Sequence, residues 1–178
     1  MTNENATVEQ LAKAIRNVPD FPQPGIQFKD ITPVLSDPRL FAGSIDFLTG
    51  HFQPGSVDAV VGIDARGFFF AAAAAYKLQC GFVPVRKKGK LPYLTYEQSY
   101  DLEYGSNTIA VHIDAVKPGS RVVLVDDLLA TGGTAGAAAN LLQRLGVEIL
   151  EAAFLIELSF LKGREKLQGF PVRSLIVY

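Results

Sequence analysis

Cysteine and long apolar runs are scarce in this chain, and each shortage excludes a class of protein. The single cysteine, Cys80, rules out an internal disulfide, and its apolar neighbours favour a buried small side chain. The longest apolar run, from Phe68 to Tyr76, is far shorter than the roughly 20 residues that cross a bilayer. The polar N-terminus lacks a signal-peptide pattern. We therefore expect a soluble domain in the cytoplasm.

The chain also lacks an excess of charge of either sign. The formal net charge is −1, so neither nucleic acid nor an anionic membrane is indicated as a partner. A chain of 178 residues with 48% hydrophobic residues suits a single domain over residues 1–178, long enough to bury about 70% of its surface. We find no internal repeat, low-complexity tract or interdomain linker.

Hydrophobic periodicity alternates along the chain between the helical and the strand pattern. Such alternation predicts an α/β fold with a mostly parallel sheet flanked by helices. Helices are expected at residues 8–15, 38–48, 65–78 and 134–145, and strands at 57–63, 81–85, 108–113, 121–125, 147–156 and 172–177. The strand at 108–113 alternates apolar and polar residues, as an edge or half-exposed strand does.

Two stretches fit neither period. "DFPQPGIQFKDITP", residues 20–33, holds three prolines and a glycine, which predict an extended, turning path and exclude helix. Residues 86–105 are basic and Tyr-rich without lasting periodicity. Such a long loop inside a compact domain is more often a functional lid than a plain connection, and we call residues 86–105 the lid loop.

"VVLVDDLLATGGTAG", residues 122–136, combines a buried strand, two acids and a glycine-rich turn that enters a helix. Gly132 and Gly133 permit backbone N–H groups to aim at an anion, with the hydroxyls of Thr131 and Thr134, at the positive end of the helix dipole. Four or five such bonds, each worth about 1.5–3 kcal/mol, would hold a phosphate. The turn has neither the lysine of a nucleoside-triphosphate loop nor the spacing of a dinucleotide fingerprint. An ordinary tight turn is the alternative.

The position of Asp126 and Asp127 beside an anion-binding turn is understandable if the ligand is more than a phosphate. A sugar phosphate carries hydroxyl donors close to its anion, and carboxylates accept hydrogen bonds from them. A bound magnesium ion would favour the same acids. Both residues then contribute to a ribose-5-phosphate site, although strand alternation leaves a purely structural role open for one of them.

An apolar strand, two acids and "ATGGT" resemble the phosphoribosyl pyrophosphate motif of the type I phosphoribosyltransferases. "DDLLATGGT" in particular is similar to the version in the adenine branch of that family. "DFPQPGIQFKDITPVL", "DARGF", "RKKGKLP", "YDLEYG" and "LKGREKL" also resemble that branch, in order, from Asp20 to Leu167. The resemblance implies the type I phosphoribosyltransferase fold with an N-terminal hood, residues 1–35, and a flexible lid. It also implies the conversion of adenine and phosphoribosyl pyrophosphate to AMP and pyrophosphate.

The family assigns the pyrophosphate end of the substrate to basic residues. Arg66 follows the strand at 57–63 and is expected near the pyrophosphate, where a guanidinium grips phosphate oxygens bidentately; a surface pair with Asp64 is the alternative. Arg86, Lys87, Lys88 and Lys90 open the lid loop and are expected to stabilise the leaving group, unless they are only a solvated face. Magnesium is expected as cofactor, held mainly through the pyrophosphate, so no metal ligands are assigned to the protein.

The family also supplies a proton acceptor and a base pocket. Glu103 is expected to accept the N9 proton of adenine and Tyr104 to hold the reacting groups; a surface acid is the alternative. Phe28 would stack on the base while the backbone of Gln27 and Lys29 reads its edge, unless Phe28 is a core residue. Many relatives have arginine where this chain has Lys29, so only its backbone role carries over. By resemblance alone, Leu158 is assigned to the apolar wall of this pocket.

Ala130 separates the chain from enzymes for 6-oxopurines, which place an acid there. That residue and the hood speak against a hypoxanthine or guanine enzyme, which is the first rival hypothesis. A regulator that senses phosphoribosyl pyrophosphate and binds nucleic acid is the second, and a sugar-phosphate binding protein is the third. The resemblance finally implies a homodimer, with adenine, phosphoribosyl pyrophosphate, AMP and pyrophosphate as ligands.

Overall fold

The computed structural model describes residues 6–101 and 106–178, and it divides into two compact units, residues 1–47 and 48–178. In the first unit, α1 (Val8–Ala14) is followed by β1 (Arg16–Pro19) and β2 (Gln27–Asp30), which pair antiparallel with Val18 opposite Phe28. The short α2 (Thr32–Ser36) and α3 (Pro38–Thr49) come next. Thr7 caps the N-terminus of α1 in a reciprocal capping box: its side chain accepts a hydrogen bond from Gln10 N, and the Gln10 side chain accepts one from Thr7 N.

The second unit is built on a seven-stranded sheet of order β5-β6-β4-β3-β7-β8-β9. Its members are β3 (Ala59–Ile63), β4 (Gly81–Lys87), β5 (Thr95–Asp101), β6 (Ser106–His112), β7 (Arg121–Leu129), β8 (Glu148–Glu157) and β9 (Val172–Val177). β4, β3, β7, β8 and β9 are parallel, whereas β5 and β6 form an antiparallel ladder at one edge. The predicted mostly parallel α/β sheet is confirmed.

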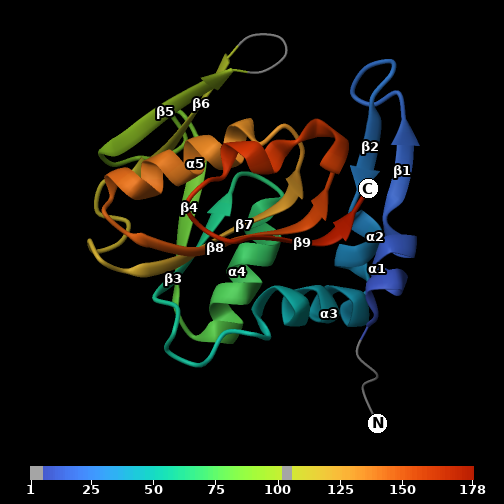
Figure 1. Cartoon of the computed structure of the whole chain (residues 1–178), viewed down its shortest axis with the longest axis horizontal. Helices are drawn as coiled ribbons and strands as arrows, with labels where there is room; N and C mark the ends of the chain where they lie inside the picture. The colour runs from blue at the N-terminus through green and yellow to red at the C-terminus, as the bar shows by residue number, and fades with distance from the viewer. Residues whose placement is uncertain (1–5, 102–105) are drawn as a thin grey trace. The chain divides into compact units, whose positions relative to one another are not determined.

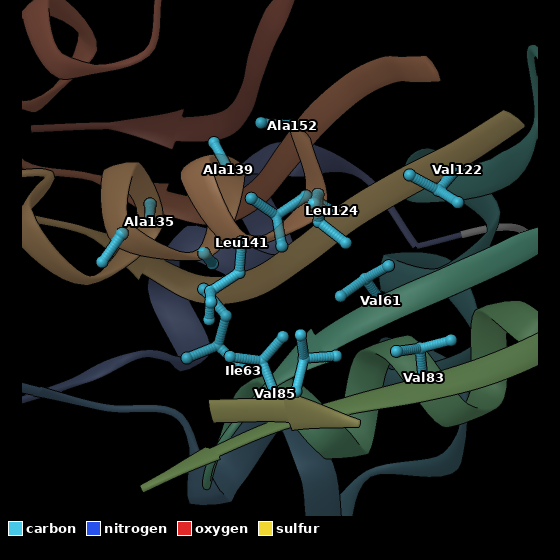
Figure 2. Close-up of a cluster of buried hydrophobic side chains, with 14 of the residues drawn as sticks. Val61, Ile63, Val83, Val85, Val122, Leu124, Ala135, Ala139, Leu141 and Ala152 are labelled. Carbon is cyan, nitrogen blue, oxygen red and sulfur yellow. The ribbon is translucent and has the colours of Figure 1, made fainter. Parts of the chain in front are cut away.

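Two helices cover opposite faces of this sheet: α4 (Gly67–Leu78) and α5 (Gly133–Arg144) (Figure 1). Gly62 of β3 leaves room for α4, because a Cβ there would lie 2.7 Å from Ala71 Cβ. Val61 and Ile63 point to the other face and join the buried cluster under α5, with Leu124 of β7 (Figure 2). This arrangement brings the carboxyl ends of β3, β4, β7 and β8 to one edge of the sheet, where ligands bind in open α/β folds.

Two parts of the lid loop, residues 86–87 and 95–101, belong to strands. β4 continues to Lys87, and β5 pairs with β6 from Thr95 opposite His112 to Asp101 opposite Ser106. Within β5 the side chains of residues 96, 98 and 100 are half-buried while those of 97 and 99 are exposed, so a strand period is present and the polar Gln98 hides it. The prediction of an edge or half-exposed strand at residues 108–113 was wrong, because β5 pairs with β6 and the successive residues Ile109, Ala110 and Val111 are all buried.

Three smaller predictions were wrong. Helix α2 begins at Thr32, inside the stretch predicted to exclude helix, because Pro33 lies in the first turn, where its missing N–H group is not needed. β7 extends to Leu129, so the acids lie within the strand and the turn is shorter than predicted. Cys80 is half-buried rather than buried, and burial raises the pKa of its thiol. Within the described residues, no helix is long and apolar enough to span a bilayer.

Candidate active site

The anion-binding turn is the link between β7 and α5. Gly132 is the N-cap of α5 with φ 75° and ψ 1°, a left-handed conformation that favours glycine, and its carbonyl accepts a 2.8 Å bond from Gly136 N. Among the described residues no side chain caps this helix, so the leading N–H groups of α5 face the end of the sheet without an intrahelical acceptor. Thr131 is exposed, and Gly133 and Thr134 are half-buried. We call Ala130–Thr134 the phosphate loop, because its geometry suits a phosphate.

The two acids lie together at the start of α4. Asp127 is 4% exposed, and its Oδ2 lies 2.9 Å from Nη2 of Arg66, the N-cap residue of α4. Asp126 Oδ1 accepts a 2.9 Å bond from Asp127 N, and a Cβ built on Gly67 would lie 2.6 Å from the same oxygen. Strand alternation therefore does not carry the two carboxylates apart, and both meet the first residues of one helix.

Burial dominates the electrostatics of this acid pair. Burial raises the pKa of Asp126 well above its ordinary value, and the neighbouring charge of Asp127 raises it further. Burial also raises the pKa of Asp127, but the Arg66 guanidinium opposes that shift. The positive end of α4 and Arg66 thus offset part of the cost of ionising these two carboxylates. Hydroxyl donors of a sugar would offset more of it, so the pair is suited to a polyol ligand.

Arg86 and Asp64 make a second ion pair at the same sheet edge. Arg86 Nε lies 3.1 Å from Asp64 Oδ2, and Arg86 Nη1 donates to the Lys90 carbonyl at 3.1 Å. The alternative in which Arg66 pairs with Asp64 is therefore wrong, since Asp64 pairs with Arg86 and Arg66 reaches Asp127. The turn from β3 to α4 includes a cis peptide bond between Asp64 and Ala65.

The predicted lysines extend along the end of β4. Lys87 is the last residue of that strand, and both Lys87 and Lys90 have exposed side chains. Lys88 Nζ lies 2.7 Å from Glu97 Oε2 on β5, so it links the two strands. Arg86 and these lysines therefore lie at or just after the carboxyl end of β4, the strand that pairs with β3, while their assignment to the pyrophosphate stays a prediction.

The predicted base-recognition residues lie in two parts of the chain. Gln27, Phe28 and Lys29 form β2 in the first unit; Phe28 packs edge-on against Phe21 with 5.0 Å between ring centroids. Gln27 and Lys29 are two residues apart, so their backbone groups point to the same side of β2. Lys29 Nζ donates to Asn17 Oδ1 at 2.7 Å, and burial lowers its pKa, so its side chain is engaged within its own unit.

Leu158 follows β8 in the second unit, and its N–H donates to the Leu129 carbonyl at 2.9 Å, which places it beside the phosphate loop. Glu103 and Tyr104 lie outside the described residues, so their assignment stays a prediction.

Sequence reasoning missed the residues that support the phosphate loop from behind. Gly163, in the turn after β8, faces Gly132 so closely that a Cβ on either glycine would overlap the backbone of the other turn. Arg164 then binds the buried Glu157 at the end of β8. The signal was present in "LKGREKL", which was noted only as a resemblance.

Comparison with known proteins agrees with this geometry. Residues 32–169 match the family model for the phosphoribosyl transferase domain. An adenine phosphoribosyltransferase of Acidothermus cellulolyticus is 57% identical over 168 residues, which cover 94% of this chain and 95% of that protein. The crystal structure of the adenine phosphoribosyltransferase of Rhodothermus marinus has a TM-score of 0.91 at 53% identity, covering 96% of this chain and 98% of that one.

The Saccharomyces cerevisiae adenine phosphoribosyltransferase, solved with adenine and an imino-altritol bisphosphate, has a TM-score of 0.89 at 42% identity and covers 94% of this chain and 97% of its own.

Proposed function

The chain belongs to the adenine phosphoribosyltransferases of the phosphoribosyl transferase family, and we propose that it transfers the 5-phosphoribosyl group of phosphoribosyl pyrophosphate to adenine, in purine salvage. AMP and pyrophosphate are the products. In this reaction the bond from the sugar C1 to the pyrophosphate oxygen breaks, the bond from C1 to adenine N9 forms, and N9 loses its proton.

One observation carries the proposal: the N-terminus of α5, which no side chain of the described residues caps, comes shortly after β7, the strand that holds Asp126 and the buried Asp127. The phosphate loop takes the 5-phosphate, with backbone N–H groups and the hydroxyls of Thr131 and Thr134 as donors. Asp126 and Asp127 take the ribose hydroxyls. Holding the sugar at both ends fixes C1 in place, which lowers the entropic part of the barrier.

Basic residues that follow β3 and that lie at or just after the end of β4 receive the leaving group. Arg66, Arg86, Lys87 and Lys90 bind the pyrophosphate, and their charges favour the transition state, in which negative charge grows on the departing oxygen. Closure of the lid loop excludes water, which would otherwise hydrolyse the activated sugar. The ion pair between Arg86 and Asp64 keeps one of these cations aimed at the sheet edge before substrate arrives.

Magnesium is the proposed cofactor. Its preferred ligands are hard oxygens, and at this edge they would come mainly from the substrate, with Asp126 and Asp127 as the carboxylates nearby. When bound, it neutralises charge on the pyrophosphate. Because Asp127 already pairs with Arg66, the substrate oxygens rather than the protein hold most of the ion.

Recognition of the base is assigned to residues 27–29 of β2 and to Leu158. Phe28 stacks on adenine, the backbone of Gln27 and Lys29 bonds its edge, and Leu158 closes one side. Glu103 accepts the N9 proton while Tyr104 positions the reacting groups. Ala130 supplies no carboxylate near the base, so Glu103 remains the proton acceptor.

A cytoplasmic homodimer completes the proposal. Phe69 and Tyr76 are seven residues apart on α4, hence on one helix face, and are 50% and 88% exposed, which supports a second copy as partner. Sedimentation velocity tests this: wild type should sediment as a dimer and Tyr76→Glu as a lighter species. A monomeric wild-type protein would contradict it.

The function itself is tested by chromatographic detection of AMP after mixing the protein with adenine and phosphoribosyl pyrophosphate. AMP should form only when both substrates are present. Absence of AMP, with phosphoribosyl pyrophosphate still binding, would favour the sensor hypothesis instead.

A further inference from the structure

The turn after β8 contains two short 3₁₀ helices, η1 (Ser159–Leu161) and η2 (Gly163–Lys166), and η2 packs along the start of α5. Two glycine contacts define the packing. Gly163 lies against Gly132, and a Cβ on Gly163 would lie 3.0 Å from Gly132 N and overlap the Ala130 carbonyl. One turn later, a Cβ on Gly136 would lie 3.3 Å from the Lys166 carbonyl. The phosphate loop and the first turn of α5 therefore rest on η2, backbone against backbone.

A buried acid fixes the position of η2. Arg164 donates from Nε to Glu157 Oε1 at 2.6 Å and from Nη2 to Glu157 Oε2 at 2.7 Å, a bidentate pair. Its Nη1 donates to the Val172 carbonyl at 2.6 Å, and Nη2 also reaches Ser174 Oγ at 3.3 Å. Glu157 is 4% exposed, and Arg164 holds the pKa of this carboxyl below its ordinary value. One guanidinium thus ties η2 to the ends of two strands.

We propose that Arg164 and Glu157 are positioning residues for the phosphate loop: their ion pair holds Gly163 against Gly132, and so sets the direction of the N–H groups that receive the 5-phosphate. This proposal rests on the proposed function. Neither side chain need touch the substrate. The pair acts through the backbone of η2. This backbone is packed tightly against the phosphate loop, because Gly163 and Gly132 face each other with no room for a side chain on either.

The chain contains a matched control in the same two strands. Glu151 of β8 is 7% exposed and accepts a 3.0 Å bond from Arg173 Nε of β9, while Arg173 Nη2 donates to the Leu48 carbonyl. This pair resembles that of Glu157 and Arg164 in chemistry and burial. It lies near the start of β8, away from the carboxyl edge. Its loss should lower stability without altering the phosphate loop.

The experiment compares Glu157→Gln with Glu151→Gln. Removing one charge-assisted pair should weaken binding of ribose 5-phosphate, measured by calorimetry, about tenfold in Glu157→Gln and less than about twofold in Glu151→Gln. In steady-state kinetics, KM for phosphoribosyl pyrophosphate should rise by a similar factor while KM for adenine stays within about twofold. Unchanged ribose 5-phosphate affinity in Glu157→Gln, or equal losses in both variants, would overturn the proposal.

Arg164→Gln is the second variant. Arg164 is half exposed, so its replacement removes the other partner of the pair without placing a new group in the core, although it leaves Glu157 without this cation. It should weaken ribose 5-phosphate binding as Glu157→Gln does, and the double variant should be no worse than either single one. Additive losses would contradict a shared role. The calorimetric measurement needs no turnover, so failure of the wild type to make AMP would count against the proposed function and leave this test intact.

Discussion

Arg66, at the N-cap of α4, contacts Asp127 of β7 across 2.9 Å, and this pair joins the two ends of the candidate site. Asp127 belongs to the strand that leads into the phosphate loop, whereas Arg66 is assigned to the pyrophosphate. A carboxylate proposed for the sugar therefore also sets the position of a cation proposed for the leaving group.

Asp127→Asn tests this double role. The amide keeps the shape of the side chain but loses the charge that holds Arg66, so phosphoribosyl pyrophosphate should bind about tenfold more weakly or worse. Calorimetry with phosphoribosyl pyrophosphate and, separately, with AMP measures the loss. Because AMP lacks the pyrophosphate, it should lose less affinity than phosphoribosyl pyrophosphate. Unchanged affinity for both ligands would remove Asp127 from the site.

Asp126→Asn should stabilise the free protein while impairing it as an enzyme. Burial raises the pKa of Asp126 in the folded state, so ionisation of this group opposes folding at pH values above its ordinary pKa of 3.8, and the opposition grows as the pH rises toward the raised value. Below 3.8 the acid is protonated in both states, and the difference vanishes. Thermal unfolding of wild type and variant from pH 3.5 to 8 should show a gain in Tm that increases with pH. A variant less stable than wild type at pH 8 would contradict this expectation.

Gly132→Ala should abolish phosphate binding. The residue has φ 75°, and a Cβ there would overlap the Gly163 carbonyl, so the loop has to move. Gly55→Ala is the control, because Gly55 also has φ 75° but nothing lies within 4 Å of its Cβ position. Both variants should lose about 1–3 kcal/mol of unfolding free energy from backbone strain. Only Gly132→Ala should lose ribose 5-phosphate binding in calorimetry; equal binding by the two variants would mean that close packing against Gly163 is irrelevant.

Glu103→Gln should reduce kcat about 100-fold or more while changing the KM of each substrate little, since a general base contributes on the order of 10²–10⁴ in rate. Initial rates at saturating phosphoribosyl pyrophosphate measure it, with Asp101→Asn, an acid two residues away, as the matched control. Turnover equal to wild type would mean that solvent, and not Glu103, accepts the N9 proton of adenine.

The parallel core and the phosphate loop were predictable from residues alone. Continuous apolar strands such as Val122–Val125 can only be buried on both faces, and Gly132 marks a left-handed turn. β5 was not predictable in the same way, because its stability depends on a ladder with β6 and on Arg144 of α5, which lies over the Tyr96 ring at 4.5 Å. Those partners are distant in sequence, and local periodicity does not report them.

The partners of the charged site residues were equally hidden. Asp64 and Arg66 are two residues apart, yet each pairs with a different strand, Asp64 with Arg86 of β4 and Arg66 with Asp127 of β7. Which charged residues pair depends on which strands are neighbours in the sheet, and the spacing of residues along the sequence does not reveal that order. The support of the phosphate loop by Gly163 was hidden for the same reason, since the contact joins the turns after two neighbouring parallel strands.

The central claim is that the chain makes AMP from adenine and discriminates against 6-oxopurines. The most direct measurement is the initial rate of nucleotide formation from phosphoribosyl pyrophosphate with adenine, hypoxanthine or guanine, each with and without magnesium. Magnesium-dependent AMP formation, with the two 6-oxo bases slower by about 100-fold or more, is the predicted result. Comparable rates with hypoxanthine or guanine would contradict the assignment of the base pocket and of Ala130.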